Sequence, residues 1–203
     1  MSYTLNPEAA KKAGASSRIS ETGPYVGHIV AAWEVESTKG TAGVEMMFKS
    51  DEGLTADYLQ VWTKNAEGRE LSGMNIVHAI MACTELRNLT IKPGEIKRGE
   101  ESKKVQTLAE LTGKRVGLML EKEPYTKNDG GSGFRMVIVC PFEADTKRTA
   151  KEKLERQDKA EAYPNIVARL KDRPMQKPQG APAQSYSNSA GPAPTGPDDD
   201  IGW

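Results

Sequence analysis

The chain has 203 residues, 37% of them hydrophobic, and its 28 Lys and Arg side chains balance 28 Asp and Glu side chains. This length fits one domain of ordinary size with a short appendage, and the balanced charge excludes a protein that coats nucleic acid by bulk positive charge alone. The charge is uneven, because residues 1–86 hold 7 basic and 11 acidic side chains whereas residues 87–135 hold 11 basic and 7 acidic ones. A locally basic surface is therefore available, although a solvated face of mixed charge is the commoner meaning of such a pattern.

Neither a membrane span nor a secretory signal is expected. No run approaches the roughly 20 apolar residues that cross a bilayer, and no charged start leads into an apolar run. Cys83 and Cys140 lie in apolar stretches, which is typical of buried, reduced thiols. We therefore expect a cytoplasmic protein that contacts no membrane, in the cytoplasm of the host cell if a phage encodes it.

The first half of the chain predicts an N-terminal arm followed by strands. Asn6-Pro7-Glu8 combines a capping side chain, a first-turn proline and an acid, as at many helix starts. Three later runs are β-prone, and apolar and polar side chains alternate in the second of them. These predicted strands are residues 25–35, 44–49 and 54–63.

The second half predicts one helix, two more strands and an appendage. Apolar residues at helical spacing predict the helix, and a charged, glycine-containing stretch after it is predicted to be a loop. The predicted elements are a helix at 72–89, a loop at 93–104, a helical turn at 107–111, strands at 114–123 and 134–142, and a charged, helix-prone appendage at 145–171 that is interrupted at Pro164.

Three strands, a helix and two strands are the order of an OB-fold, a small five-stranded Greek-key barrel with its helix between strands three and four. We therefore predict a mainly β protein built on such a barrel. The predicted domains are an N-terminal arm (1–22), an OB-fold-like nucleic-acid-binding domain (23–143), a charged helical appendage (144–173), a disordered linker (174–197) and an acidic tip (198–203).

The acidic tip is the most specific motif of the chain. It places Ile201 and Trp203 after three carboxylates, Asp198, Asp199 and Asp200. The linker before it is rich in Pro, Gly, Ala, Ser and Gln, a composition that predicts a flexible tether. The tip resembles that of bacterial and phage single-stranded-DNA-binding proteins, whose bacterial form reads Asp-Asp-Asp-Ile-Pro-Phe. Gly202 and Trp203 depart from it, and the globular part lacks the bacterial pattern, so a phage-type member is the closer comparison.

The resemblance implies that the tip binds partner proteins of replication or recombination. Ile201 and Trp203 would fill an apolar pocket, and Asp198, Asp199 and Asp200 would meet its basic rim. The alternative is an accidental acidic tail on a protein of another kind. The oligomeric state is left open.

A protein that holds single strands needs aromatic rings that stack on bases and cations that follow phosphates. Tyr58, Gln60 and Trp62 share one face of the third predicted strand. Trp62 and Tyr58 have two open roles, stacking on bases or packing in the core, whereas Trp33 is expected in the core. The complete predicted nucleic-acid site comprises Tyr58, Gln60, Trp62, Lys64, Lys49, Arg115, Lys122, Tyr125, Lys127 and Arg135.

Signals for catalysis or for a cofactor are weak. His28 and His78 have no Cys, Asp or Glu neighbours at metal-ligand spacing, and Cys83 and Cys140 lack the CxxC spacing of zinc sites. We therefore predict no enzyme, no metal and no cofactor.

The sequence predicts sequence-independent binding of single-stranded DNA in phage replication or recombination, with the tip recruiting enzymes. A strand-annealing or RNA-binding protein on the same barrel is one alternative. A β-barrel adaptor that binds proteins and no nucleic acid is another.

Overall fold

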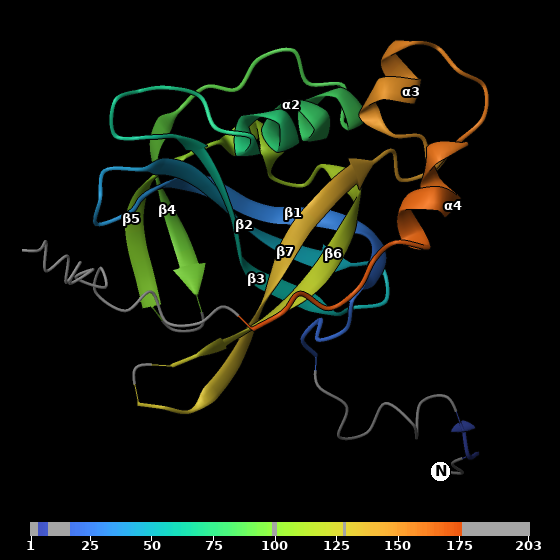
Figure 1. Ribbon diagram of the computed structural model, residues 1–203, viewed down its shortest axis with the longest axis horizontal. Coiled ribbons are helices and arrows are strands. Elements are labelled where there is room, and N and C mark those ends of the chain that lie inside the picture. Colours follow the sequence, from blue (N-terminus) through green and yellow to red (C-terminus); the bar gives the residue numbers. More distant parts are fainter. Residues whose placement is uncertain (1–3, 8–16, 99–100, 128, 176–203) are drawn as a thin grey trace, which may run out of the picture.

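The strands of the protein form one antiparallel sheet around a long first strand (Figure 1). The computed structural model describes residues 4–7, 17–98, 101–127 and 129–175. Within them the sheet has seven strands: β1 (Gly23–Glu36), β2 (Ala42–Ser50), β3 (Thr55–Lys64), β4 (Lys92–Arg98), β5 (Glu101–Thr107), β6 (Arg115–Thr126) and β7 (Ser132–Phe142).

Strand β1 organises the sheet because it pairs along both of its edges. One edge pairs with β2, which pairs in turn with β3. The other edge pairs with β6 over Gly23–His28 and with β5 at Trp33, opposite Thr107. Strand β4 pairs with β5, and β7 pairs with β6. All of these ladders are antiparallel, and hairpins join β1 to β2, β2 to β3, β4 to β5 and β6 to β7.

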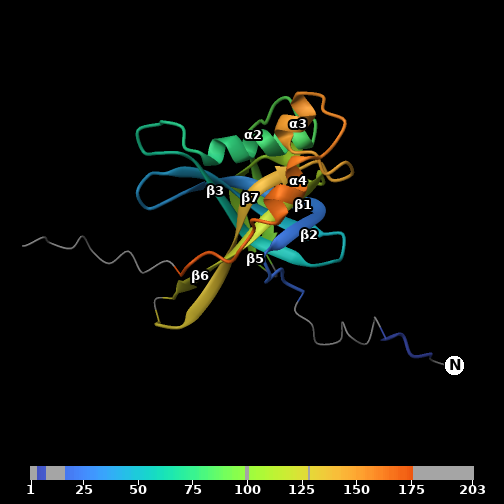
Figure 2. The same cartoon turned by 45° about the vertical axis from the view of Figure 1, so that its right-hand side comes forward.

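The core lies between the inner face of the sheet and one helix. Alternating side chains of β2 and β3 point inward, as the period-2 pattern of both strands predicts. Val77 and Ile80 of α2 (Gly73–Cys83) pack on the same cluster, and α2 lies across one end of the strands (Figures 1 and 2). The largest fully buried members of this cluster are Phe48, Ile19, Ile29, Met46, Leu59, Ile80, Leu111, Leu118, Leu120 and Val116.

The predicted mainly β class, the first three strands and the helix after the third strand are confirmed. The helix is shorter than the predicted range 72–89, since it ends at Cys83. There the hydroxyl of Thr84 donates to the carbonyl of Ile80 at 2.7 Å, and Glu85 takes a left-handed φ of 59°. The Thr84 hydroxyl competes for a backbone carbonyl of the last turn, and Glu85 takes the left-handed conformation that commonly follows a helix. Both features favour the end of the helix here.

Two predictions about the second half were wrong. The expected loop at 93–104 is the β4–β5 hairpin, so the described residues form a sheet of seven strands where five were predicted. Its side chains are mostly exposed on both faces, so the apolar alternation that reveals a half-buried strand is nearly absent. Pro164 does not interrupt the appendage but lies in the first turn of α4 (Ala162–Val167), where its missing N–H costs no helical hydrogen bond. The short 3-10 helix η1 (Ala109–Leu111) confirms the predicted turn.

Partly buried ionic contacts and a buried capping carboxylate fix the C-terminal helices to the sheet. Glu143, just after β7, contacts Lys153 of α3 (Ala150–Leu154) at 2.7 Å and Arg148 at 2.9 Å. Glu152 completes a capping box with Thr149 and also accepts a 2.7 Å hydrogen bond from the amide of Ala162, where α4 begins. These carboxylates therefore set the positions of both helices.

Among the described residues, no helix is long and apolar enough to cross a membrane.

The N-terminal arm and the C-terminal region are described only in part. Ser17 and Ile19 exchange backbone hydrogen bonds with Thr55, so the end of the arm lies beside β3. Residues 171–175 run beside β6, where the amide of Arg173 donates to the carbonyl of Lys122 at 2.8 Å. Most of the predicted linker and the whole tip, Asp198 to Trp203, lie outside the described residues.

We expect acid to destabilise the fold through Glu143. Burial alone raises its pKa, but hydrogen bonds from Lys153, Thr146 and Arg148 outweigh burial and lower the pKa from 4.5 to about 2. The stabilisation from a depressed carboxyl pKa is complete above its unfolded value and disappears as the pH falls toward its folded value. Glu143→Gln should therefore lower the free energy of unfolding at pH 7 by about 1.5–3 kcal/mol.

Urea unfolding at a series of pH values measures this effect. The variant should lose less stability than the parent protein between pH 4.5 and pH 2. Glu155→Gln is the control, because the carboxylate of Glu155 forms a 3.9 Å pair with Lys151 and accepts a hydrogen bond from Gln157, both at the exposed surface, where such contacts contribute little. Parallel pH curves for Glu143→Gln and the parent protein would contradict the assignment.

Candidate nucleic-acid interface

Strand β3 presents an aromatic outer face. Leu59 and Val61 are buried in the core, whereas Tyr58 is 48% exposed, Gln60 is exposed and Trp62 is half-buried. This is the alternation that the sequence predicts for the strand. At about 3.3 Å per residue, the two rings lie roughly 13 Å apart along one face.

A β-bulge directs Tyr58 to that face. The β2–β3 register shifts between Met46, which pairs with Leu59, and Phe48, which pairs with Ala56, so Asp57 and Tyr58 lie opposite one residue of β2. Tyr58 adopts a φ of 62°, a conformation that costs a bulky L-residue on the order of 1–3 kcal/mol. The surrounding ladder holds the strained backbone in place and thereby orients an aromatic ring outward.

Trp62 is supported by a glycine on the neighbouring strand. Gly43 of β2 pairs with Trp62, and a Cβ at Gly43 would lie 2.8 Å from Cε3 of the indole. One side of the ring therefore packs on the backbone of β2, while the residue stays half-buried at the surface. Trp33, by contrast, is only 3% exposed and lies with the buried residues, as the sequence favours.

A small pocket separates β3 from β7. Among the described residues, no strand ladder joins these two strands. Their side chains enclose about 170 Å³, and the lining residues are Tyr58, Gln60, Trp62, Glu123, Arg135, Met136, Val137 and Arg173. Four predicted site residues, Tyr58, Gln60, Trp62 and Arg135, are thus brought together from two strands distant in the sequence.

Carboxylates position the polar groups of this pocket. The amide of Gln60 donates to Glu45 at 2.6 Å, and Nε of Arg173 donates to Glu121 at 2.9 Å. Nε of Arg135 donates to Glu123, whose side chain is buried while that of Arg135 remains 46% exposed. Arg135 is therefore oriented by an ion pair while its side chain stays partly exposed at the mouth of the pocket, and an oriented guanidinium suits an anion.

Lys49 and Arg115 lie in a separate row on the same sheet. His28 pairs with Lys49 on one side and with Arg115 on the other. Arg115 contacts Asp51 at 2.8 Å and also contacts Asp145, and hydrogen bonds to these carboxylates raise its pKa further. This predicted site residue therefore joins the β2–β3 turn to the segment after β7. Lys64 is exposed at the end of β3, close to Trp62.

The remaining predicted residues lie on the β6–β7 hairpin, which extends beyond the rest of the sheet (Figure 1). Nζ of Lys122 lies 4.9 Å from the centroid of the Phe134 ring, a cation–π contact. The ring of Tyr125 covers Gly133, and Tyr125 is 38% exposed. Lys127 is exposed at the hairpin turn. These three residues form a group apart from the β3–β7 pocket.

The described residues offer little for redox or metal chemistry. Among them, no group of three or more His, Cys, Asp and Glu side chains could hold a metal ion. Burial raises the pKa of Cys83 to about 12 and also raises the pKa of Cys140. Both thiols are therefore protonated at neutral pH and are poor nucleophiles.

The sequence reasoning missed the exposed lysines of the β4–β5 hairpin as functional candidates. Lys97, Lys103 and Lys104 all lie on this hairpin and are exposed. The excess of basic residues between 87 and 135 was the available signal. It was not assigned to a defined surface because the segment was predicted to be a loop.

The φ of Tyr58 predicts an unusual order of substitutions. Tyr58→Gly should change the free energy of unfolding by no more than about 1 kcal/mol. Glycine adopts a positive φ without steric strain, and this gain offsets the entropy that glycine ordinarily loses in a strand. Tyr58→Val should destabilise by about 1–3 kcal/mol, because a β-branched residue is strained at positive φ. Thermal or urea unfolding of both variants gives the comparison. Strand propensity alone would make Tyr58→Val the more stable of the two variants. That result would show that the bulge does not hold residue 58 at a positive φ.

No known protein family matches the sequence, and no curated protein matches it.

Proposed function

We propose that the protein binds single-stranded DNA without sequence preference, through the outer face of β3 and the pocket between β3 and β7. The observation that carries the proposal is the placement of Tyr58 and Trp62 on one face, opposite Arg135. Two accessible rings provide stacking surfaces that suit any base, and an oriented guanidinium provides a phosphate contact.

The pairing of the strands supports an OB-fold-like barrel as the scaffold. With the β4–β5 hairpin set aside, the order β3-β2-β1-β6-β7 and the helix after β3 follow the OB-fold arrangement, whose strands two and three carry the oligonucleotide-binding face. In this proposal β4 and β5 are an insertion before the fourth barrel strand. Among the described residues no ladder joins β3 to β7, so side chains rather than backbone pairing would complete such a barrel there.

The distribution of charge favours single strands over duplex. The whole chain is neutral, so bulk charge gives it little hold on the regular phosphate backbone of a duplex. Stacking needs splayed bases, which only a single strand offers. The acidic residues around the pocket, Glu45 and Glu123, are each bonded to a neighbouring polar side chain. These two carboxylates therefore orient the side chains of Gln60 and Arg135, and their negative charge is partly offset by those donors.

Fluorescence titration with oligo(dT) and with duplex of equal length, at two salt concentrations, tests the proposal. Oligo(dT) should quench tryptophan fluorescence and bind more tightly than the duplex, with an affinity that falls as salt rises. Trp62→Ala should weaken binding by roughly 1–3 kcal/mol if its ring stacks on a base. Trp62→Phe is the matched control, because it keeps a ring over Gly43.

A melt of each sample separates binding from folding. If Trp62→Ala binds normally and melts normally, Trp62 does not belong to the site. Equal binding of both nucleic acids would count against a single-strand binder. No binding to either would favour the adaptor alternative, and tighter binding of oligo(U) or faster annealing of complementary strands would favour the RNA-binding or annealing alternatives.

We propose further that the tip, Asp198 to Trp203, recruits replication or recombination enzymes. Deletion of the tip should leave the melting temperature unchanged, since the predicted linker separates it from the fold. Capture of partner enzymes from infected-cell lysate should be lost. The affinity for DNA should stay level or rise slightly at low salt, because a tethered anion competes with phosphate for the same cations. A truncated chain that loses DNA binding or keeps every partner would overturn this role.

A further inference from the structure

The exposed face of β3 continues onto the neighbouring strand β2. Trp62 is opposite Gly43 and Gln60 is opposite Glu45, and residues directly opposite each other in an antiparallel ladder share a face. Every second residue of a strand lies on the same face, so Lys49, four positions after Glu45, belongs to this face as well. Lys49 is exposed. The aromatic face of β3 is therefore bordered by a cation at the end of β2.

A row of exposed side chains starts at Lys49 and crosses β1. Lys49 is opposite His28, and His28 is opposite Arg115 of β6. All three residues are exposed, whereas Ile29, the next residue of β1, lies in the core. We call Lys49, His28 and Arg115 the basic row. With about 4.8 Å between strands and 3.3 Å per residue, His28 lies roughly 12 Å from Tyr58 across this face.

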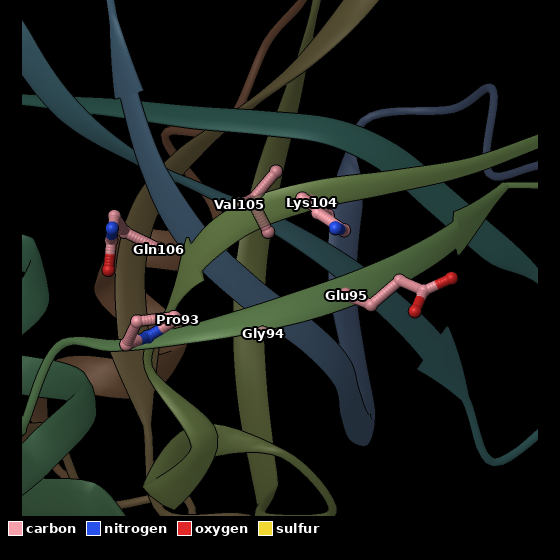
Figure 3. A pocket seen from close by; sticks show the side chains of 6 residues that line it. All are labelled: Pro93, Gly94, Glu95, Lys104, Val105 and Gln106. Atoms are coloured by element: carbon pink, nitrogen blue, oxygen red, sulfur yellow. The ribbon is translucent and has the colours of Figure 1, made fainter.

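The other end of the β3 face offers no such continuation. There Gln60 is followed by Glu45 and Trp33, which are both buried, and then by Thr107 of β5. Figure 3 shows the hollow on the β4–β5 hairpin, and four of its lining residues lie on the face away from Thr107: Pro93, Glu95, Lys104 and Gln106. The exposed surface of β3 is therefore extended through Lys49 and not through the hairpin.

The protonation of His28 decides the net charge of the basic row. Arg115 contacts Asp51 at 2.8 Å and also contacts Asp145. A ring nitrogen of His28 lies 3.7 Å from an oxygen of Asp51, and Lys49 forms no ion pair with another described residue. The two carboxylates balance Lys49 and Arg115 while His28 is neutral. A proton on His28 gives the group one positive charge.

A protonated His28 lies directly opposite a second cation, Lys49. The Cβ atoms of such a pair are about 4.5–5.5 Å apart, and like charges at this separation repel each other. A phosphate between the two side chains offsets this repulsion and accepts a charge-assisted hydrogen bond from each. Because a histidine ordinarily changes its charge between about pH 5 and 8, a bound phosphate favours the proton, and the proton favours the phosphate by the same factor.

We propose that Lys49 and His28 form a phosphate site for the single strand that the β3 face binds, and that His28 takes up a proton from solvent as the phosphate binds. The inference rests on the proposed function and extends it, because it adds a residue outside the predicted site and directs the strand from Tyr58 toward β1. Arg115, held by its two carboxylates, positions the row. Binding of single-stranded DNA is therefore stronger in mild acid.

Titrations with oligo(dT) between pH 5.5 and pH 8 test the proposal, because His28 and His78 are the two histidines of the chain and other side-chain types ordinarily keep their charge in this range. At low salt the affinity of the parent protein should rise by about fivefold or more as the pH falls, and salt should weaken the effect. His28→Gln should bind at every pH as the parent does at pH 8. His28→Lys, with a permanent charge, should bind at every pH as the parent does at pH 5.5.

His78→Gln is the matched control. It removes the other histidine, which is exposed on α2, and it should keep the full pH dependence of binding. NMR of the unmodified full-length protein gives a second measurement. The titration midpoint of the His28 ring protons should move to higher pH when oligo(dT) is bound, and that of His78 should stay where it is.

The outcomes separate this inference from the proposed function. If oligo(dT) binds and Trp62→Ala weakens binding, but the affinity is the same at every pH or its pH dependence survives in His28→Gln, the phosphate site is wrong and the β3 site stands. An unmoved NMR midpoint of His28 has the same meaning. If the parent protein binds no oligo(dT), both proposals are wrong. A pH dependence that is lost in His28→Gln and kept in His78→Gln would support the phosphate site.

Discussion

The change of partner along one edge of β1 is the constraint on which the rest of the structure depends. Up to His28 this edge pairs with β6, and at Trp33 it pairs with β5. Between them, the amides of Gly113 and Leu108 donate to the carbonyls of Ile29 and Ala32 at 2.7 and 2.9 Å. The segment around η1 thus satisfies the backbone groups that neither strand reaches, as a buried edge requires. One strand can therefore carry both the β6–β7 pair and the β4–β5 hairpin on a single sheet.

The sequence predicts those elements that bury one face and misses those that do not. Strand β3 was recognisable because Leu59 and Val61 alternate with Tyr58, Gln60 and Trp62, and burial follows the same alternation. The β4–β5 hairpin buries little apart from Ile96, so its sequence resembles a charged loop. Periodicity arises from burial, and a hairpin that projects from the sheet leaves no such pattern.

The candidate site was predictable as a list of residues but not as a geometry. The shared face of Tyr58 and Trp62 follows from a period of two, whereas their meeting with Arg135 depends on how β3 approaches β7. The φ of Tyr58 comes from the register shift between β2 and β3, which no single strand encodes. In the same way, Arg115 reads as a surface cation in the sequence, yet Asp51, far away in the chain, is its partner. Long-range pairing decides which charges remain available to a ligand.

The attachment of residues 171–175 to β6 has a mechanical consequence. Arg173 holds this segment through its amide, bonded to Lys122, and through its guanidinium, bonded to Glu121, and it also lines the pocket beside Trp62. Lys171, Asp172 and Met175 add hydrogen bonds with Glu121, Thr22 and Thr126. A force applied to the chain beyond residue 175 is therefore carried first by this group of hydrogen bonds and by the wall of that pocket. The hydrophobic core lies behind them and is loaded later. Tension on the C-terminal part of the chain would thus loosen the edge of the pocket before it disturbs the fold.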